Sequence, residues 1–291
     1  MLIDLKLLGR MMTKSNSITS ESTKRHSPWV RVMHWTNVVC FFVLLMSGLN
    51  IFNSNSSLFW GKSSYNGTEP LLQIKGRVTE QGEMVGTTTV FGHRFNTTGV
   101  LGASTLNGNP VVRAFPSWTT IPDRKWLSMA RLWHFFFAWV FVINGLLYII
   151  YAIKSRHLGR DLAPTTDDWH GFWQSVKDHI RFKHPTGEAA KRYNILQKLT
   201  YLIVIFVLLP MVILMGLAMS PMVNTVITGW VDWFGGRQSA RTLHFIVAWL
   251  LVAFVFIHVF LVIVTGFWNN MRGMITGRYE IKSHGNEGDA A

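Results

Sequence analysis

The sequence predicts an all-α integral membrane protein, a four-helix transmembrane bundle with a loop and β-turn insertion between spans one and two. Only 15% of its 291 residues are charged and 49% are hydrophobic, whereas soluble domains contain about 25% charged residues. Four stretches without Asp, Glu, Lys or Arg are long enough to cross a bilayer, which requires about 20 apolar residues. The basic residues are also unevenly distributed between the segments that flank these stretches.

Each expected span is a run of apolar residues. The four runs are Val32 to about Phe52, Leu132–Ile153, Leu199 to about Val223, and Thr242 to about Trp268. Pro210 and Gly216 interrupt the third run, and membrane helices tolerate such residues. The single cysteine, Cys40, lies inside the first run. Because the chain has one cysteine, cysteine-rich metal sites are excluded, as is haem attached covalently through a C-x-x-C-H motif.

The basic residues predict that both termini are cytoplasmic. With that orientation the cytoplasmic segments carry 18 Lys and Arg and the outer segments carry 10, as the positive-inside rule requires. The net charge of +13 therefore belongs mostly to loops beside anionic lipid. No nucleic-acid motif accompanies it, so we expect membrane lipid and not nucleic acid as a partner.

The segments outside the spans divide into four parts. Residues 1–28 are polar and basic and are expected to form a disordered cytoplasmic leader, so the first span is an uncleaved anchor. Residues 53–128 alternate apolar and polar side chains at Leu71–Val78 and Met84–Phe91, which predicts short strands in a cap or docking surface. Residues 154–198 form a cytoplasmic loop with a short amphipathic helix, and residues 276–291 a cytoplasmic tail.

Three histidines begin spans in a repeated frame. The frames are Arg31-x-x-His34, Arg131-x-x-His134 and Arg241-x-x-His244, and a fourth histidine, His258, lies deep in the last span. His244 and His258 are 14 residues apart, which places them about 40° apart around one helix and about 21 Å apart along it. One helix face therefore presents an imidazole near each membrane surface.

The depths of the four histidines sort them into two pairs. His134 and His244 begin their spans on the outer side and are named the outer pair; His34 and His258 lie near the inner side and are named the inner pair. Each pair comes from two helices, as a cofactor held between helices requires. Two imidazoles can bind one haem iron axially and favour electron transfer. Buried polar residues in a membrane are costly and tend to be functional.

The arginines have a predicted role beside these histidines. An arginine one turn before each ligand, at the water boundary, can bind a haem propionate through its planar guanidinium. Arg31 would serve the inner haem, and Arg131 and Arg241 the outer haem. The alternatives are snorkelling anchors for the arginines, interfacial polar residues for the histidines, and a divalent metal site. Zinc usually takes four clustered ligands, and the spans contain no Asp or Glu.

The remaining histidines are expected to be solvated. They lie in the leader, the outer segment, the inner loop and the tail: His26, His93, His157, His170, His179, His184 and His284. His170 stands within the cluster Trp169–Trp173, which could lie near a quinone or a lipid headgroup.

Over residues 29–275 the chain resembles the bacterial di-haem b-type cytochromes that are membrane subunits of Ni,Fe-hydrogenases, formate dehydrogenases and thiosulfate reductase-like molybdoenzymes. The resemblance rests on Arg31-Val-Met-His34-Trp35, on His134, and on the His244/His258 spacing. The segment Tyr193-Asn-Ile-Leu-Gln-Lys-Leu-Thr-Tyr201 is similar to the branch with molybdopterin-dependent partners. The long segment 53–128 and the basic leader depart from the family pattern.

The resemblance implies a function. Two haem b groups, one held by His34 and His258 and the other by His134 and His244, form an electron path across the bacterial inner membrane. A quinone would act as electron donor or acceptor near the inner haem. The outer haem would face a periplasmic molybdopterin-dependent or hydrogenase-type catalytic subunit. The chain itself would be a non-catalytic electron-transfer subunit of a larger oxidoreductase, and a quinone/quinol reaction at a site of its own stays open.

Two other functions remain open from the sequence. One is a self-contained transmembrane haem reductase of a small periplasmic acceptor, although no charged outer pocket is evident. The other is a transporter with histidine proton relays, although only the third span contains mid-span breakers, and the Arg-x-x-His repeats do not form the inverted halves typical of transporters.

Overall fold

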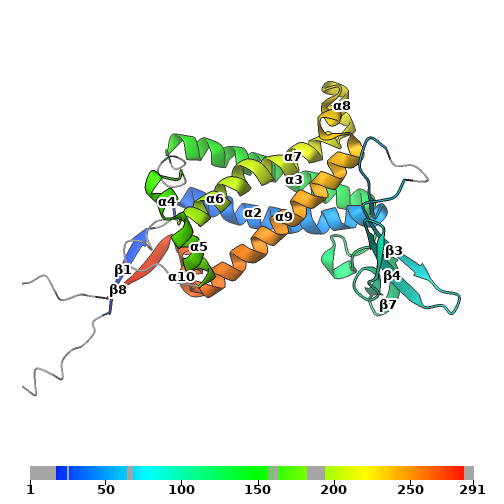
Figure 1. Ribbon diagram of the computed structural model, residues 1–291, viewed down its shortest axis with the longest axis horizontal. Coiled ribbons are helices and arrows are strands. Elements are labelled where there is room, and N and C mark those ends of the chain that lie inside the picture. The colour runs from blue at the N-terminus through cyan, green and yellow to red at the C-terminus, as the bar shows by residue number, and fades with distance from the viewer. Residues whose placement is uncertain are drawn as a thin grey trace, which may run out of the picture. The chain divides into compact units, whose positions relative to one another are not determined.

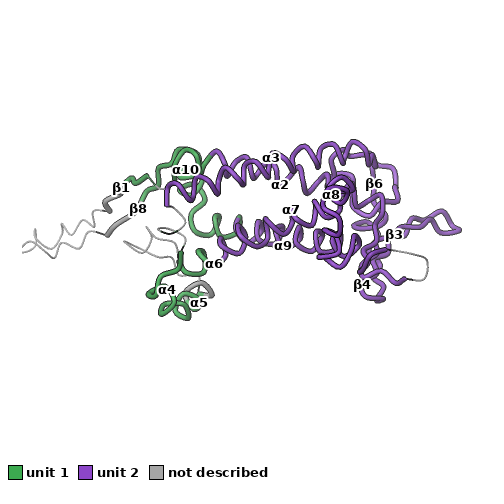
Figure 2. Tube along the Cα trace, turned by 90° about the horizontal axis from the view of Figure 1, so that it is seen from above, with its two compact units in different colours: residues 1–31, 159–199, 259–291 green, residues 32–158, 200–258 purple. Residues whose placement is uncertain are grey.

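The structure is a computed structural model that describes residues 18–24, 26–63, 68–156, 159, 163–181 and 194–284. The chain divides into two units (Figure 2). Unit 1 contains residues 1–31, 159–199 and 259–291, and unit 2 contains residues 32–158 and 200–258.

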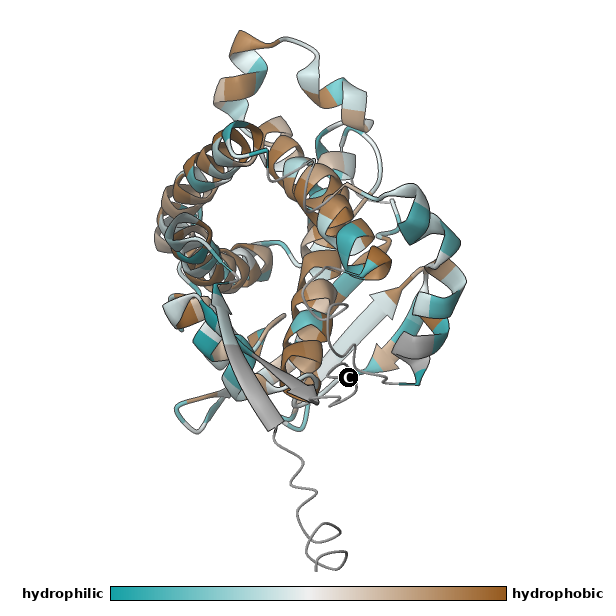
Figure 3. Ribbon diagram, turned by 90° about the vertical axis from the view of Figure 1, so that its left-hand side faces the viewer, coloured by the Kyte–Doolittle hydropathy of each residue, from teal (hydrophilic) through white to brown (hydrophobic). Residues whose placement is uncertain are grey.

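Four apolar helices are long enough to cross a membrane, which confirms the predicted fold class. They are α2 (Pro28–Ser54), α3 (Leu127–Lys154), the continuous helix Ile195–Ala218, and α9 (Arg237–Val264). Helices α2, α3, α7 and α9 run side by side (Figure 1), and hydrophobic residues dominate them (Figure 3). Large apolar side chains such as Phe256, 75% exposed, face outward. Such surfaces suit lipid, because lipid tails are as apolar as leucine.

The third span is built from three segments. It comprises α6 (Ile195–Ile203), a π-helical turn η4 (Val204–Leu208) and α7 (Leu209–Ala218), with Pro210 in the first turn of α7. Proline has no N–H to donate and its ring displaces the carbonyl four residues earlier. A π-turn directly before the proline accommodates that displacement without ending the helix.

The helix boundaries differ from the expected ones at both ends. Each of the four helices begins four or five residues before its apolar run, and the third and fourth also end earlier than expected. Helix α7 ends at Ala218 and α9 at Val264, whereas apolar composition extended these spans to about Val223 and Trp268. Gly266 has φ +110°, which an α-helix cannot include. After it the chain resumes as α10 (Phe267–Thr276).

The insertion between α2 and α3 is made of short strands. A four-stranded antiparallel sheet has the order β2 (Ser57–Leu58), β3 (Leu72–Val78), β4 (Met84–Val90), β5 (His93–Asn96). A separate hairpin pairs β6 (Gly102–Leu106) with β7 (Asn109–Arg113), and η1 (Ser117–Thr119) follows. Strands β3 and β4 begin and end within one residue of the alternating segments in the sequence.

Three glycines allow the hairpin to cross the sheet. Gly76 and Gly86 are paired across β3 and β4. A Cβ on Gly76 would lie 2.1 Å from the Gly102 carbonyl oxygen, and a Cβ on Gly86 would lie 2.1 Å from that of Leu101. Any side chain at either position would force the hairpin away from the sheet.

The insertion and the bundle share one hydrophobic core. Leu49 and Phe52 of α2 pack with Leu58, Ile74 and Phe115 of the insertion. The Phe52 and Phe245 rings are 5.0 Å apart, centre to centre. Asn53 accepts a 2.7 Å hydrogen bond from the Phe115 amide. The insertion is therefore a cap built onto the helix ends.

The same cap holds the start of α9. The Gly61 carbonyl accepts hydrogen bonds from the amides of Gln238 and Ser239, two of the four amides that an α-helix leaves unpaired at its start. The Thr242 hydroxyl donates to the Phe59 carbonyl at 2.6 Å. Between α7 and α9 lie α8 (Pro221–Val226) and the 3-10 turn η5 (Trp230–Phe234).

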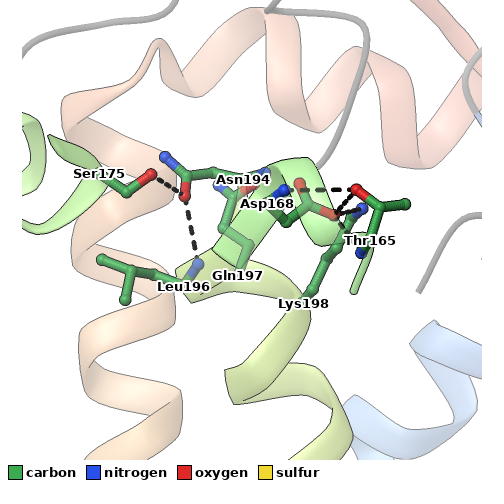
Figure 4. A network of polar contacts seen from close by, with 7 residues as sticks. All are labelled: Thr165, Asp168, Ser175, Asn194, Leu196, Gln197 and Lys198. Atoms are coloured by element: carbon green, nitrogen blue, oxygen red, sulfur yellow. Dashed lines mark hydrogen bonds and ion pairs between the residues drawn. The ribbon is translucent and has the colours of Figure 1, made fainter. Parts of the chain in front are cut away.

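Unit 1 contains two short helices from the loop between α3 and α6. They are α4 (Thr166–His170) and the amphipathic α5 (Phe172–Ile180). Thr165 caps α4, and Asp168 forms a 2.7 Å ion pair with Lys198, as Figure 4 shows. In the same figure Asn194 accepts a hydrogen bond from Ser175.

One part of the leader differs from the expectation of disorder. In unit 1, β1 (Ile18–Lys24) pairs in antiparallel fashion with β8 (Arg278–His284). Pairing with a strand distant in sequence supplies order that local composition does not reveal. Residues 1–17 lie outside the described residues, as do residues 285–291 of the tail.

Candidate haem sites

The inner pair comes together from the first and last spans. His34 of α2 and His258 of α9 have ring centres 6.4 Å apart. The Trp35 and His34 rings meet edge to face. Phe254, one turn before His258, stacks on the His258 ring with 5.8 Å between ring centres. The two imidazoles thus face each other with aromatic rings beside them.

The outer pair comes together from the second and last spans. His134 of α3 and His244 of α9 have ring centres 6.3 Å apart. Both pairs were expected from depth alone, and the structure places each pair at nearly the same separation.

These separations fit one metal ion between each pair of rings. A metal–imidazole bond is about 2 Å long, so two such bonds with the ring radii require roughly 6 Å between ring centres. A direct hydrogen bond between two imidazoles would bring the rings closer than a shared metal ion. Among the described residues no three His, Cys, Asp or Glu side chains gather as metal ligands. The donor set therefore fits an axial bis-imidazole site and not a zinc site.

Backbone carbonyls determine which nitrogen of each outer histidine faces its partner. The Nδ1 atoms of His134 and His244 lie 3.1 Å from the Leu44 carbonyl oxygen and 2.8 Å from that of Val212. A carbonyl can only accept, so each Nδ1 must carry the proton. Each Nε2 lone pair is then free to bind a metal, the arrangement usual for ligating histidines.

Two glycines provide the surfaces on which the outer histidines lie. A Cβ on Gly48 would be 3.4 Å from His134 Cε1, and a Cβ on Gly216 would be 3.5 Å from His244 Cε1. Each glycine follows by four residues the carbonyl that accepts from the same histidine. Helices α2 and α7 therefore present the same device, a carbonyl and a glycine one turn apart.

The sequence reasoning missed these supporting residues. It treated Gly216 only as a helix breaker and assigned nothing to Gly48. It also missed Asn144, a buried amide on α3 that donates to the Met33 carbonyl at 2.9 Å and to Asn37 Oδ1 at 2.7 Å. An amide in the middle of a span is itself a signal, because unpaired polar groups are costly there.

The three arginines have other contacts in the structure. Arg241 donates to the carbonyls of Asn55 and Ser57 and lies over the Phe52 ring. Within unit 1, Arg31 donates to the Ile275 carbonyl. Arg131 is exposed, and its guanidinium carbon lies 5.5 Å from the centre of the Phe135 ring. Arg241 thus joins α9 to the cap, and Arg131 has the most exposed position of the three.

The other histidines differ in what the structure describes. His93 is exposed on β5, and His170 is exposed at the end of α4, where its Nδ1 donates to the Thr166 carbonyl. His157 and His184 lie outside the described residues, and the side chains of His179 and His284 are not described.

The segment that contains both histidine pairs matches a known protein family. The family model for prokaryotic cytochrome b561 matches residues 25–277, a range that includes all four helices and both histidine pairs. The chain belongs to the prokaryotic cytochrome b561 family. It is accordingly a membrane protein that binds haem b and carries electrons, which confirms the resemblance found in the sequence.

One curated relative is similar in sequence to this chain over most of its length. The chain is 27% identical over 237 residues to a putative protein-methionine-sulfoxide reductase subunit, YedZ1, of Azospira oryzae. The match covers 81% of this chain and 89% of that relative. The family membership makes haem b the cofactor to consider at the paired histidines.

Proposed function

We propose that this cytochrome is the electron-transfer subunit of a larger oxidoreductase, with two bis-histidine haem b groups that connect a membrane quinone to a periplasmic partner. The observation that carries the proposal is the nearly equal spacing of two histidine pairs, 6.4 Å and 6.3 Å between ring centres. Haem b would supply reversible one-electron chemistry at each pair.

The residues of this chain hold and orient the cofactors. His34 with His258 would bind the inner haem, and His134 with His244 the outer haem. The carbonyls of Leu44 and Val212 keep both outer rings in the tautomer that leaves Nε2 free. The arginine that we propose for a haem propionate is Arg131, because Arg31 and Arg241 already donate to backbone carbonyls.

The partner is proposed to be a molybdopterin-dependent catalytic subunit in the periplasm. The relative is described as a subunit of a putative protein-methionine-sulfoxide reductase, which favours a reductase. The segment 193–201 supports the molybdopterin-dependent branch by resemblance. Neither the relative nor that segment favours the hydrogenase-type partner, so we do not propose it.

We propose the bacterial inner membrane as the location, with both termini in the cytoplasm and residues 29–275 as the di-haem domain. The distribution of Lys and Arg supports this orientation. The cap, residues 53–128, is then periplasmic, and its location at the helix ends is suited to contact the partner.

The decisive experiment is a dithionite-reduced minus oxidised spectrum of the detergent-purified protein, with haem quantified per chain. We expect low-spin b-type bands from two haems per chain. His34→Ala or His258→Ala should remove one haem, and His134→Ala or His244→Ala the other. Exposed His93→Ala is the matched control and should retain both. A colourless protein would contradict the proposal, and a single haem would show that one histidine pair is wrong.

A further inference from the structure

Ser47 is a fully buried hydroxyl beside the outer pair. Its side chain is 0% exposed, and its Oγ lies 3.1 Å from His134 Nδ1. The same Oγ lies 2.6 Å from the Val43 carbonyl oxygen, one turn earlier in α2. Ser47 therefore contacts a proposed haem ligand from the side opposite its metal-binding nitrogen.

The direction of these hydrogen bonds follows from the carbonyls. The Ser47 hydroxyl donates its only proton to Val43, which leaves its lone pairs to accept from His134 Nδ1–H. The Leu44 carbonyl, 3.1 Å from the same nitrogen, accepts from it as well. His134 Nδ1–H is thus shared between two acceptors.

Among the described residues, no second acceptor is found at Nδ1 of the other paired histidines, His34, His244 and His258. His244 Nδ1 donates to one carbonyl, that of Val212. His34 Nδ1 is buried, and the described residues offer it no hydrogen-bond partner. The second acceptor on His134 therefore distinguishes the outer pair from the inner pair.

We infer that Ser47 is a positioning residue that fixes the His134 ring and selectively lowers the reduction potential of the outer haem. An acceptor on Nδ1–H makes the opposite nitrogen more basic. A more basic axial ligand stabilises ferric over ferrous iron, and such hydrogen bonds are a recognised control of haem potential. The inference rests on the proposed function, since it assumes haem at the outer pair.

The test is a spectroscopic redox titration of the purified holoprotein and its Ser47 variants. In Ser47→Ala the outer haem should titrate at a higher potential, while the inner haem should not shift. The His34→Ala protein, which keeps only the outer haem, identifies the outer step. The low-spin ferric electron paramagnetic resonance signal of the outer haem should also change, because the ring loses one of its two fixed contacts.

Two further variants separate hydrogen bonding from packing. Ser47→Cys still fills the position of the hydroxyl oxygen but offers only a weak sulfur acceptor, so its outer potential should move toward that of Ser47→Ala. Ser155→Ala is the matched control, because Ser155 also donates to a carbonyl four residues earlier, at 2.7 Å. It should leave both potentials unchanged.

The possible outcomes are distinct. An outer potential that is unchanged in both Ser47 variants, or equal shifts at both haems, overturns the inference. So does Ser47→Cys behaving as wild type while Ser47→Ala shifts, since packing alone would then explain the effect. If the unmodified protein binds no haem at His134 and His244, the proposed function itself fails, and the titration shows that directly.

Discussion

Gly48 and Gly216 contribute by their lack of a side chain. Each lies against the Cε1 edge of an outer histidine, where a Cβ would already be in van der Waals contact with the ring, at 3.4 or 3.5 Å. Valine at either position would place methyl groups where the ring lies, and overpacking of this kind shifts neighbouring side chains. A larger side chain behind His134 or His244 should therefore disturb the outer haem and leave the inner haem in place.

We expect Gly48→Val and Gly216→Val to lose the outer haem and retain the inner one, measured as haem per chain and as the remaining titration step. The matched control is Gly145→Val on α3, because nothing lies within 4 Å of a Cβ there. Its change in helix propensity is the same. Loss of haem from the Gly145 variant would show that a general helix effect is responsible.

Asn53 shows how one helix end and the cap depend on each other. Its side chain accepts from the Phe115 amide at 2.7 Å, and all of these groups are buried. Removing the Asn53 side chain leaves the buried Phe115 N–H without this acceptor, which costs about 1–3 kcal/mol. Asn53→Ala should lower the free energy of unfolding by that amount and expose the cap to protease.

The control for this variant is Asn109→Ala, because Asn109 is exposed on β7. An exposed substitution away from such contacts should change stability by less than about 0.5 kcal/mol. Equal effects of the two variants would mean that the cap does not depend on Asn53.

The ion pair between α4 and α6 is pH-dependent with a defined sign. Burial raises the pKa of Asp168, but the hydrogen bonds from Lys198 and Thr165 and the Lys198 charge outweigh it, so the pKa is lowered. A lowered pKa stabilises the fold above the unfolded value of about 3.9. That stabilisation is lost as the pH falls through the folded-state pKa.

We expect Asp168→Asn to accelerate hydrogen exchange in α4 at neutral pH and to remove this acid dependence. The Lys198 side chain, 10% exposed, would lose its carboxylate partner. Asp167→Asn is the control, because Asp167 lies in the same first turn and is exposed. Faster exchange in both variants would indicate a general charge effect at the start of the helix.

At the scale of the whole molecule, the distribution of Lys and Arg predicts which ends of the bundle face the cytoplasm. The chain permits a direct test because Cys40 is its single cysteine and is buried, 1% exposed. In a Cys40→Ser background, Asn109→Cys would report on the cap and Lys177→Cys on α5.

A membrane-impermeant thiol reagent added to spheroplasts should label Asn109→Cys, and label Lys177→Cys only after the membrane is opened. The Cys40→Ser protein is the unlabelled control. Labelling of Lys177→Cys from outside would reverse the orientation and, with it, the proposed location of the partner.

Sequence patterns predicted the four apolar helices, the family and the strands β3 and β4. These follow from local properties: hydropathy over about 20 residues, period-two alternation, and histidines at a fixed spacing along one helix. Depth along the spans also predicted which histidines face each other, because a helix rises by a constant length per residue.

The surroundings of those histidines became visible only when the helices were seen packed together. The acceptors at Leu44 and Val212, the hydroxyl of Ser47 and the glycines at 48 and 216 belong to helices other than those of the histidines they contact. The backbone contacts of Arg241 and the pairing of β1 with β8 are likewise distant in sequence. Such contacts depend on how the helices rotate and pack against one another, and the pattern within one segment does not specify that rotation.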